Sequence, residues 1–129
     1  MSRTDPIRVL ILEDNVFDAE LMVRELRRSG LEIQADRVYS EQTFAAKLAL
    51  RPHIVLSDNA VPLFGSREAL QHVRAHGLDI PFIVVSGSLR EDALAEAMRD
   101  GADDYVSKDE LSGLGAAVAR ALDKRSHGA

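Results

Sequence analysis

The chain contains no cysteine among its 129 residues. A disulfide framework, a thiolate nucleophile and a cysteine-based zinc site are therefore all excluded. The sequence also lacks a glycine-rich phosphate loop after its first apolar run, which argues against flavin, dinucleotide and P-loop nucleotide binding. Its histidines, although two of them are four residues apart, show no spacing that would bring three metal ligands together. Several common kinds of site are thus removed, and the absence of cysteine fits a reducing cytoplasm.

Long hydrophobic runs and an excess of positive charge are missing as well. The first six residues are polar, and no stretch is long enough to act as a signal peptide or a membrane span. The net charge of -5 at pH 7 disfavours binding to the phosphates of nucleic acids. These absences predict a cytoplasmic location, with neither DNA nor a membrane as a partner.

Five short apolar runs rich in β-branched residues alternate with amphipathic stretches. Such runs predict β-strands, and the first, third and fourth are nearly continuous, as expected of strands that are covered on both faces of a parallel sheet. The predicted strands are residues 7–12, 33–38, 53–57, 81–86 and 104–107. The first, third and fourth runs should therefore form the middle of the sheet.

Helices are predicted between successive strands and after the last strand, because apolar residues there recur every three or four positions. The predicted helices begin near residues 16, 40, 66, 91 and 111. The first is expected to stop at Gly30, a residue that suits a helix C-terminus. In the last helix, Gly113 and Gly115 weaken the first turns by about 1 kcal/mol each relative to alanine, so fraying is expected there.

Strict alternation of strand and helix predicts an α/β fold with a parallel sheet and right-handed crossovers. A chain of 129 residues has room for one domain with a hydrophobic core but not for a second. The sequence contains no linker, repeat or low-complexity segment. We therefore expect residues 1–129 to form a single domain, with a core at about 7–122 and a frayed tail at 123–129.

Five polar residues lie where the predicted strands end. Glu13 and Asp14 follow the first strand, and Asp58 follows the third. Ser86 closes the fourth strand and Lys108 follows the fifth. Because ligands of open α/β sheets bind beyond the carboxyl ends of the strands, we expect these side chains to converge on one edge.

This set of side chains suits a metal and a phosphoryl group. Three neighbouring carboxylates repel one another and favour a hard cation, for which Mg²⁺ with its oxygen ligands is the natural choice. A carboxylate beside Mg²⁺ can accept a phosphoryl group as a nucleophile. Lys108 and Ser86 would then supply a positive charge and a hydroxyl group to the phosphate oxygens.

Each position also has an ordinary structural explanation. Glu13 and Asp14 could cap the first helix, and Asp58 could be a turn residue. Lys108 taken alone is more often a solvated side chain, and Ser86 could belong to a turn. The coincidence of all five residues at strand ends on one side of a single sheet favours the functional interpretation.

Four segments at these strand ends resemble the receiver domains of two-component signalling, and the resemblance extends from about residue 7 to residue 122. The segments are Leu-Glu-Asp-Asn at 12–15, Ile-Val-Leu-Ser-Asp at 54–58 with Pro62 four residues on, Phe-Ile-Val-Val-Ser-Gly at 82–87, and Gly-Ala-Asp-Asp-Tyr-Val-Ser-Lys at 101–108. Each segment alone is a weak signal, whereas together they are highly specific. The resemblance implies a flavodoxin-like sheet of five parallel strands in the order 2-1-3-4-5.

The same resemblance implies a phosphoacceptor and a set of metal ligands. Asp58 would accept the phosphoryl group from a histidine kinase or a histidine phosphotransfer protein. Asp14, Asp58 and the backbone carbonyl of Ala60 would bind Mg²⁺ directly, and Glu13 would act through water.

The resemblance further implies a switch. Ser86 would be the switch hydroxyl and Tyr105 the switch aromatic, while Lys108 would contact the phosphate. The simpler interpretation of Tyr105 is a half-buried strand aromatic. The implied output is a conformational change read by a downstream protein, from a domain that is a monomer or a weak dimer.

Two other functions remain open on the sequence. A Mg²⁺-dependent phosphohydrolase could use Asp58 as its nucleophile, but that class usually carries a second acid two residues later, where this chain has Ala60. A pseudo-receiver could merely hold partners together, although the presence of Asp58, Ser86 and Lys108 argues against it. We therefore expect a phosphoacceptor domain that catalyses only its own phosphorylation and dephosphorylation, and is not otherwise an enzyme.

Overall fold

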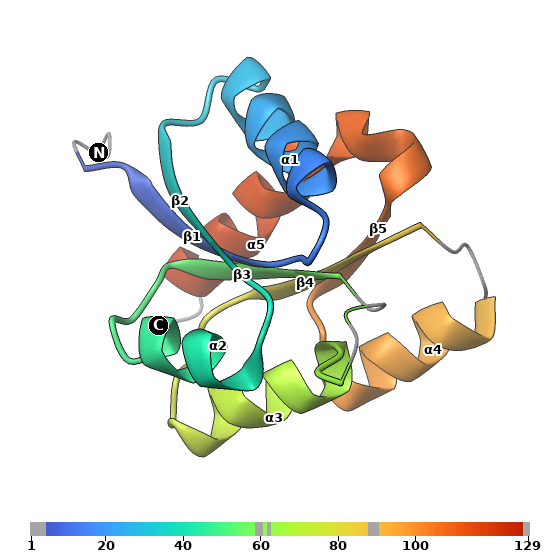
Figure 1. The fold of residues 1–129 in the computed structure, drawn as a ribbon. Coiled ribbons are helices and arrows are strands. Elements are labelled where there is room, and N and C mark those ends of the chain that lie inside the picture. Colours follow the sequence, from blue (N-terminus) through green and yellow to red (C-terminus); the bar gives the residue numbers. More distant parts are fainter. Residues whose placement is uncertain (1–4, 59–60, 62, 88–90, 128–129) are drawn as a thin grey trace.

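The structure is a computed structural model that describes residues 5–58, 61, 63–87 and 91–127. Strands and helices alternate along these residues (Figure 1). The strands are β1 (Ile7–Leu12), β2 (Ile33–Val38), β3 (Ile54–Asp58), β4 (Phe82–Ser86) and β5 (Asp104–Ser107). The helices are α1 (Val16–Arg28), α2 (Glu41–Leu48), α3 (Ser66–Ala75), α4 (Glu91–Asp100), the 3-10 helix η1 (Lys108–Gly113) and α5 (Leu114–His127).

The strands form one parallel sheet in the order β2-β1-β3-β4-β5, which confirms the flavodoxin-like order. Helices α1 and α5 cover one face of the sheet, and α2, α3 and α4 cover the other (Figure 1). The direction in which strands are added to the sheet reverses at β1. Strand β2 lies on one side of β1, whereas β3, β4 and β5 lie on the other side. In sheets of this kind the ligand lies at that reversal, beyond the carboxyl ends of the strands.

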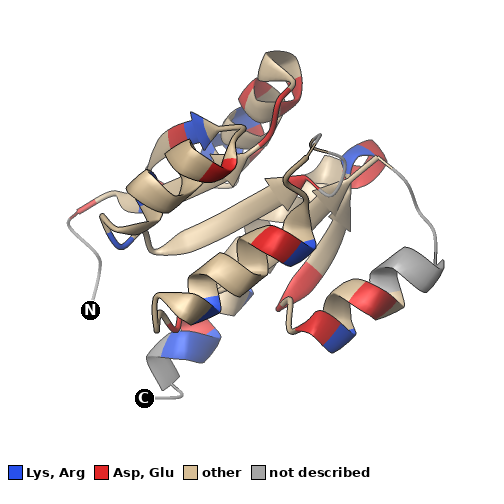
Figure 2. Cartoon of the chain, turned by 60° about the horizontal axis from the view of Figure 1, so that its bottom comes forward, with Lys and Arg blue, Asp and Glu red and all other residues tan. Residues whose placement is uncertain are grey.

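Two hydrophobic clusters lie on opposite faces of the sheet. Met22 and Leu26 of α1 pack with Val118 of α5 on one face, and Phe44 and Leu48 of α2 pack on the other. Every residue of β3 and β4 is buried. Figure 2 accordingly shows the strands largely free of Lys, Arg, Asp and Glu, which gather on the helices and at strand ends.

Helix α1 begins and ends where the sequence predicts. The side chain of Asn15 accepts hydrogen bonds from the backbone N–H groups of Phe17 and Asp18, which would otherwise have no partner at the start of the helix. At the other end Gly30 adopts a φ of 92°, a left-handed conformation that glycine allows at little cost. The cap at Asn15 fixes the first turn of α1 directly beside the end of β1.

The start of the last helix differs from the prediction. Residues Lys108–Gly113 form the 3-10 helix η1, in which Glu110 has non-helical angles, and α5 begins only at Leu114. Leu111, expected on the buried face of an α-helix, therefore lies in η1 and packs against the edge of the core. The low helix propensity of Gly113 fits this break.

Gly115 is important for the packing of α5 against α1, although its low helix propensity alone predicts only a weaker helix. A Cβ atom at this position would overlap the Oγ and Cβ atoms of Ser29, the C-cap residue directly after α1. Open space surrounds Gly113 instead. Gly115 therefore allows α5 to approach the end of α1 closely, which any larger residue would prevent.

Residues 123–127, which the sequence predicts to be a frayed tail, lie in α5 in the structure. Arg125 explains the difference, because its guanidinium lies 3.0 Å from the Asp79 carboxylate and 3.0 Å from the Asp103 carboxylate. Both acids flank strands at the end of the sheet opposite the predicted site. These ion pairs tie the last turns of α5 to the body of the domain.

Candidate metal and phosphoryl site

Parallel pairing brings the predicted site residues to one edge of the sheet. Leu12, which precedes Glu13, pairs with Ser57, and Asp58 pairs with Val85. Asp58 is the last residue of β3. The sequence predicted that this strand would end one residue earlier, at Ser57. Ser86 pairs with Ser107, which directly precedes Lys108. The ends of β1, β3, β4 and β5 therefore deliver their polar residues to a common place.

Glu13, Asp14 and Asp58 form an acidic cluster. Each offers a carboxylate oxygen that lies within 4.8 Å of the corresponding oxygens of the other two. Glu13 is completely buried and Asp58 is 3% exposed, whereas Asp14 is exposed. The cluster thus has two carboxylates in the interior and one at the surface, through which an ion could enter.

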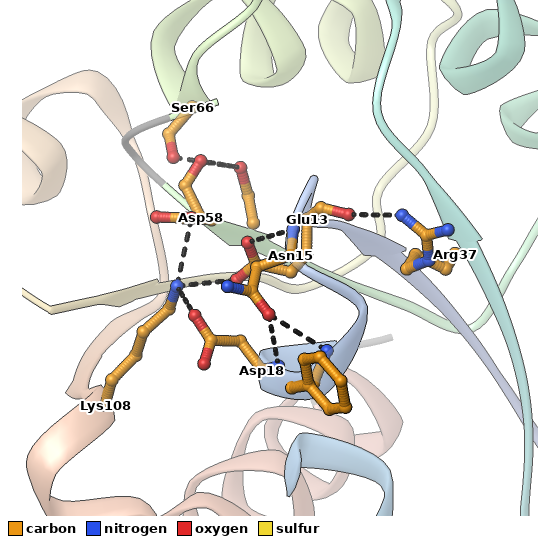
Figure 3. A network of polar contacts seen from close by, with 9 residues as sticks. Glu13, Asn15, Asp18, Arg37, Asp58, Ser66 and Lys108 are labelled. Atoms are coloured by element: carbon orange, nitrogen blue, oxygen red, sulfur yellow. Dashed lines mark hydrogen bonds and ion pairs between the residues drawn. The ribbon is translucent and has the colours of Figure 1, made fainter. Parts of the chain in front are cut away.

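Lys108 supplies the positive charge in the centre of the site. Its Nζ atom lies 2.7 Å from Glu13 Oε1, 2.7 Å from Asp18 Oδ2 and 3.1 Å from Asp58 Oδ2 (Figure 3). The Lys108 side chain is 18% exposed, so these contacts are poorly screened by water. One ammonium group therefore offsets part of the repulsion among several acids.

The environment shifts the pKa values of both Glu13 and Lys108. Burial raises the pKa of Glu13 to about 7, with Asp58 adding to the rise and the hydrogen bond from Lys108 opposing it. Burial also disfavours the charged form of Lys108, yet its hydrogen bonds to the three carboxylates prevail and raise its pKa. One ammonium group is therefore too little to keep Glu13 fully charged at neutral pH, and a further cation would favour its charged form.

Backbone and side-chain contacts hold Glu13 in place. Its Oε2 atom accepts a hydrogen bond from the backbone N–H of Asn15 at 3.1 Å. Its backbone carbonyl accepts a hydrogen bond from the Arg37 guanidinium at 3.2 Å, reaching across from β2 (Figure 3). The carboxylate is therefore positioned before any ligand arrives, which reduces the entropy that a ligand would have to offset.

Sequence reasoning missed Asp18, which belongs to the site. It lies in the first turn of α1, four residues after Asp14, and its carboxylate reaches Lys108. The spacing of residues in an α-helix could have indicated Asp18. This residue lies three positions after the cap at Asn15, and a residue at that spacing returns to the side of the helix that faces the sheet edge. In the sequence Asp18 resembles any acidic residue near a helix N-terminus, where negative charge is favourable.

Sequence reasoning also missed a buried pair of hydroxyl groups behind Asp58. Ser57 Oγ and Ser66 Oγ lie 2.9 Å apart, and both residues are buried. The bond joins the end of β3 to the first residue of α3 (Figure 3). Because the two serines are nine residues apart and belong to different elements, no local pattern could indicate their contact.

Three further residues that the sequence predicted for the site are Ser86, Tyr105 and Ala60. Ser86 is 4% exposed at the end of β4. Tyr105 is half-buried in β5 and packs against the cluster on the α2, α3 and α4 face. Ala60, expected to offer its carbonyl to the metal, lies outside the described residues.

The donor set fits Mg²⁺ better than a softer metal. The acids present are carboxylates, and neither cysteine nor histidine belongs to the cluster. Two inner carboxylates and one outer carboxylate leave room for the waters that Mg²⁺ usually keeps.

Within the part of the chain that the structure describes, no helix is both long and apolar enough to cross a bilayer.

Comparison with known proteins agrees with this geometry. The family profile described as "Response regulator receiver domain" matches residues 9–119. A protein-glutamate methylesterase/protein-glutamine glutaminase of Koribacter versatilis is 31% identical over 110 residues, which cover 82% of this chain and 30% of that protein. The regulatory protein AtoC of Escherichia coli is 30% identical, with 92% of this chain and 26% of that protein covered. The chain therefore spans about a third or less of the length of these relatives.

A solved structure shows the same fold. The receiver domain of a sensor histidine kinase from Pseudomonas aeruginosa PAO1, with a magnesium ion coordinated in its active-site cleft, has a TM-score of 0.75 and 20% identity. The match covers 92% of this chain and 99% of that structure. The chain belongs to the response regulator receiver domain family of two-component signalling. Receiver domains bind Mg²⁺ at an acidic site, and the described residues contain such a cluster.

Proposed function

We propose that this chain accepts a phosphoryl group on Asp58 from a histidine kinase or a histidine phosphotransfer protein, in a reaction that requires Mg²⁺. The observation that carries the proposal is the position of Asp58. It is buried at the end of β3, within 3.1 Å of the Lys108 ammonium and within 4.8 Å of the carboxylates of Glu13 and Asp14.

The acidic cluster would hold the metal. Asp14 and Asp58 are the proposed direct ligands, with the backbone carbonyl of Ala60 as a third, and Glu13 would contribute through water. Mg²⁺ bound there would neutralise charge on the phosphoryl oxygens and on the carboxylates around them. The raised pKa of Glu13 supports this assignment, because a bound cation would favour the charged form of Glu13 that burial, and to a smaller extent Asp58, disfavour.

In the transfer itself, a carboxylate oxygen of Asp58 forms a bond to phosphorus while the bond from phosphorus to the donor imidazole nitrogen breaks. The electron pair of that bond stays on the nitrogen, and the imidazole is released. Lys108 would pair with a phosphoryl oxygen, and the Ser86 hydroxyl would donate a hydrogen bond to another. The product is an aspartyl phosphate held inside the domain.

The signal would be a change of contacts after transfer. As Lys108 and Ser86 turn toward the new phosphate, Tyr105 would move in the space beside β5 and alter the surface formed by α4 and β5. A downstream protein would bind this altered surface. We propose that the domain acts by protein contact in the cytoplasm as a monomer or weak dimer, without binding DNA or a membrane.

Exposed apolar residues next to the site support docking of a protein donor. Phe17 is 72% exposed and Leu21 is 47% exposed, and both lie on α1 within one turn of Asp18. Apolar side chains of this size on a free surface are typical of protein contacts. A donor seated there would bring its phosphohistidine over the edge of the sheet.

Labelling by a small phosphodonor tests the proposal. Incubation with acetyl phosphate and Mg²⁺ should add one phosphoryl group per chain, detected by intact-mass spectrometry, and a chelator should prevent it. Asp58→Asn should abolish the label, whereas Asp36→Asn, which removes an exposed acid of β2, should retain it.

Two outcomes would overturn the proposal. Labelling of the Asp58→Asn variant at the level of the unchanged protein would place the phosphoryl group elsewhere. Continuous release of phosphate from many phosphomonoesters, instead of retention of one group per chain, would favour a phosphohydrolase.

A further inference from the structure

A groove of about 480 Å³ is lined by residues of β1, α1 and the edge strand β2. Its apolar lining comes from β1, α1 and β2, and its charged lining comes from α1 and β2. The apolar residues are Ile11, Val16, Ala19, Val23 and Ala35, and the charged residues are Glu20, Arg24, Arg27 and Arg37. Among the described residues, β2 pairs only with β1, so nothing in the sheet covers this side.

The charge of the groove is opposite to that of the chain. The whole chain carries a net charge of -5, whereas the groove is lined by three arginines and one glutamate. The side chains of Arg24 and Arg27 form no hydrogen bond or ion pair with another described residue. Arg28, in contrast, is already paired with Glu25 on the same helix. Two free guanidinium groups therefore border the groove on one side.

Arg37 borders the groove on the other side and is held in place. Its guanidinium donates to the Glu13 carbonyl at 3.2 Å and lies 4.8 Å from the centre of the Tyr39 ring. An arginine fixed in this way loses little conformational freedom when a carboxylate binds to it. The arginines of α1 and β2 thus offer positive charge from both walls.

The floor of the groove is apolar and accessible. Val16 is 43% exposed, and Val23 and Ala35 are half-buried. A free inorganic anion would leave this surface in contact with water, and a nucleic acid backbone offers no apolar group as large as an aliphatic or aromatic side chain. A peptide with an apolar side chain between acidic residues satisfies both the floor and the walls.

We propose that the groove between α1 and β2 binds a short acidic peptide segment of a partner protein. An aliphatic or aromatic side chain of the segment lies on Val16, Val23 and Ala35, and its carboxylates pair with Arg24, Arg27 and Arg37. None of the residues that line the groove belongs to the acidic cluster of Glu13, Asp14 and Asp58.

Fluorescence anisotropy with a defined probe tests the proposal. The probe is a fluorescein-labelled peptide of sequence Glu-Asp-Leu-Phe-Asp-Glu, and it should bind the full chain with an affinity that falls as salt is added. A peptide with lysine at the four acidic positions should not bind. A peptide with serine in place of leucine and phenylalanine should bind more weakly.

Variants locate the binding. Arg24→Gln combined with Arg27→Gln should weaken the probe about tenfold, because two carboxylate contacts are lost. Arg67→Gln combined with Arg120→Gln removes the same charge outside the groove and should leave the affinity unchanged, while circular dichroism checks that both proteins are folded. Equal weakening by the two double variants, or no binding of the acidic probe, would overturn the proposal. Tighter binding of a thymidine oligonucleotide than of the peptide would assign the surface to nucleic acid and overturn it as well.

Discussion

The ammonium group of Lys108 and the carboxylate of Asp18 lie 2.7 Å apart, and this ion pair joins the segment after β5 to the first turn of α1. The Asp18 side chain is 34% exposed and the Lys108 side chain 18% exposed, so the pair is only partly screened. It makes Lys108 a link between two elements, in addition to its proposed role beside Asp58.

Asp18→Asn should lower the free energy of unfolding by about 1 kcal/mol, because Lys108 loses one of its counter-ions while remaining mostly buried. Asp109→Asn removes an exposed acid that is adjacent to Lys108 in sequence and serves as the control. Urea denaturation of both variants without metal checks the effect. An Asp18→Asn protein no less stable than the control would show that the ion pair contributes nothing.

Asp14→Asn should stabilise the metal-free protein by about 1 kcal/mol, because it removes one of the like charges in the cluster. It should also weaken Mg²⁺ binding, because a proposed ligand is lost. Thermal melts with and without Mg²⁺ measure both effects, with Glu32→Gln as a control at an exposed acid outside the cluster. Equal Mg²⁺-dependent shifts in Tm for the variant and the unchanged protein would contradict the assignment of Asp14.

The raised pKa of Glu13 predicts how stability depends on pH. Between its ordinary value of 4.5 and its folded value of about 7, the folded state keeps a proton that the unfolded state has lost. The contribution of Glu13 to the free energy of unfolding therefore falls as pH rises through this range. Lys108 stays charged throughout, because its pKa is raised further above neutrality.

Glu13→Gln should remove this dependence, so the variant should gain stability relative to the unchanged protein as pH rises from about 4.5 to 7. Urea denaturation without metal at several pH values checks the difference. Parallel pH profiles for the two proteins would show that Glu13 does not titrate in this range.

Gly115→Ala should destabilise the protein by about 1 to 3 kcal/mol, because the added methyl group overlaps Ser29. Gly113→Ala, at a position with open space around it, should cause no such loss. Ser29→Gly removes the Cβ atom that blocks the alanine, so the double variant Ser29→Gly with Gly115→Ala should recover part of the loss. If Gly115→Ala is as stable as Gly113→Ala in thermal unfolding, the close approach of α5 to α1 is not required.

The outline of the fold could be predicted from the sequence, because the strands are short apolar runs and the helices carry an apolar residue every three or four positions. The runs ending at Leu12 and Ser86 indicated where strands end, and the resemblance to receiver domains supplied their order in the sheet. Contacts that depend on tertiary packing could not be predicted. The low helix propensity of Gly115 gave no sign that α1 lies against it, and the contact of Ser57 with Ser66 depends on where the start of α3 lies relative to the end of β3.

The positions of Glu13 and Asp58 in the acidic cluster could be predicted from the sequence, whereas the contact of Asp18 with Lys108 could not. Glu13 follows β1 and Asp58 ends β3 in a parallel sheet, so topology alone brings them to one edge. The position of Asp18 depends on the exact start of α1 at the Asn15 cap, which sequence patterns locate only within a few residues. Its contact with Lys108 therefore emerges only from the structure.

The location of the phosphoryl group tests the central claim most directly. After treatment with acetyl phosphate and Mg²⁺, reduction of the acyl phosphate with borohydride followed by peptide mass mapping identifies the modified residue. We expect the modification on Asp58 alone, and its loss when Mg²⁺ is chelated. Modification of Asp14 or Glu13 in place of Asp58, or an unmodified chain under conditions in which Mg²⁺ binds, would contradict the account.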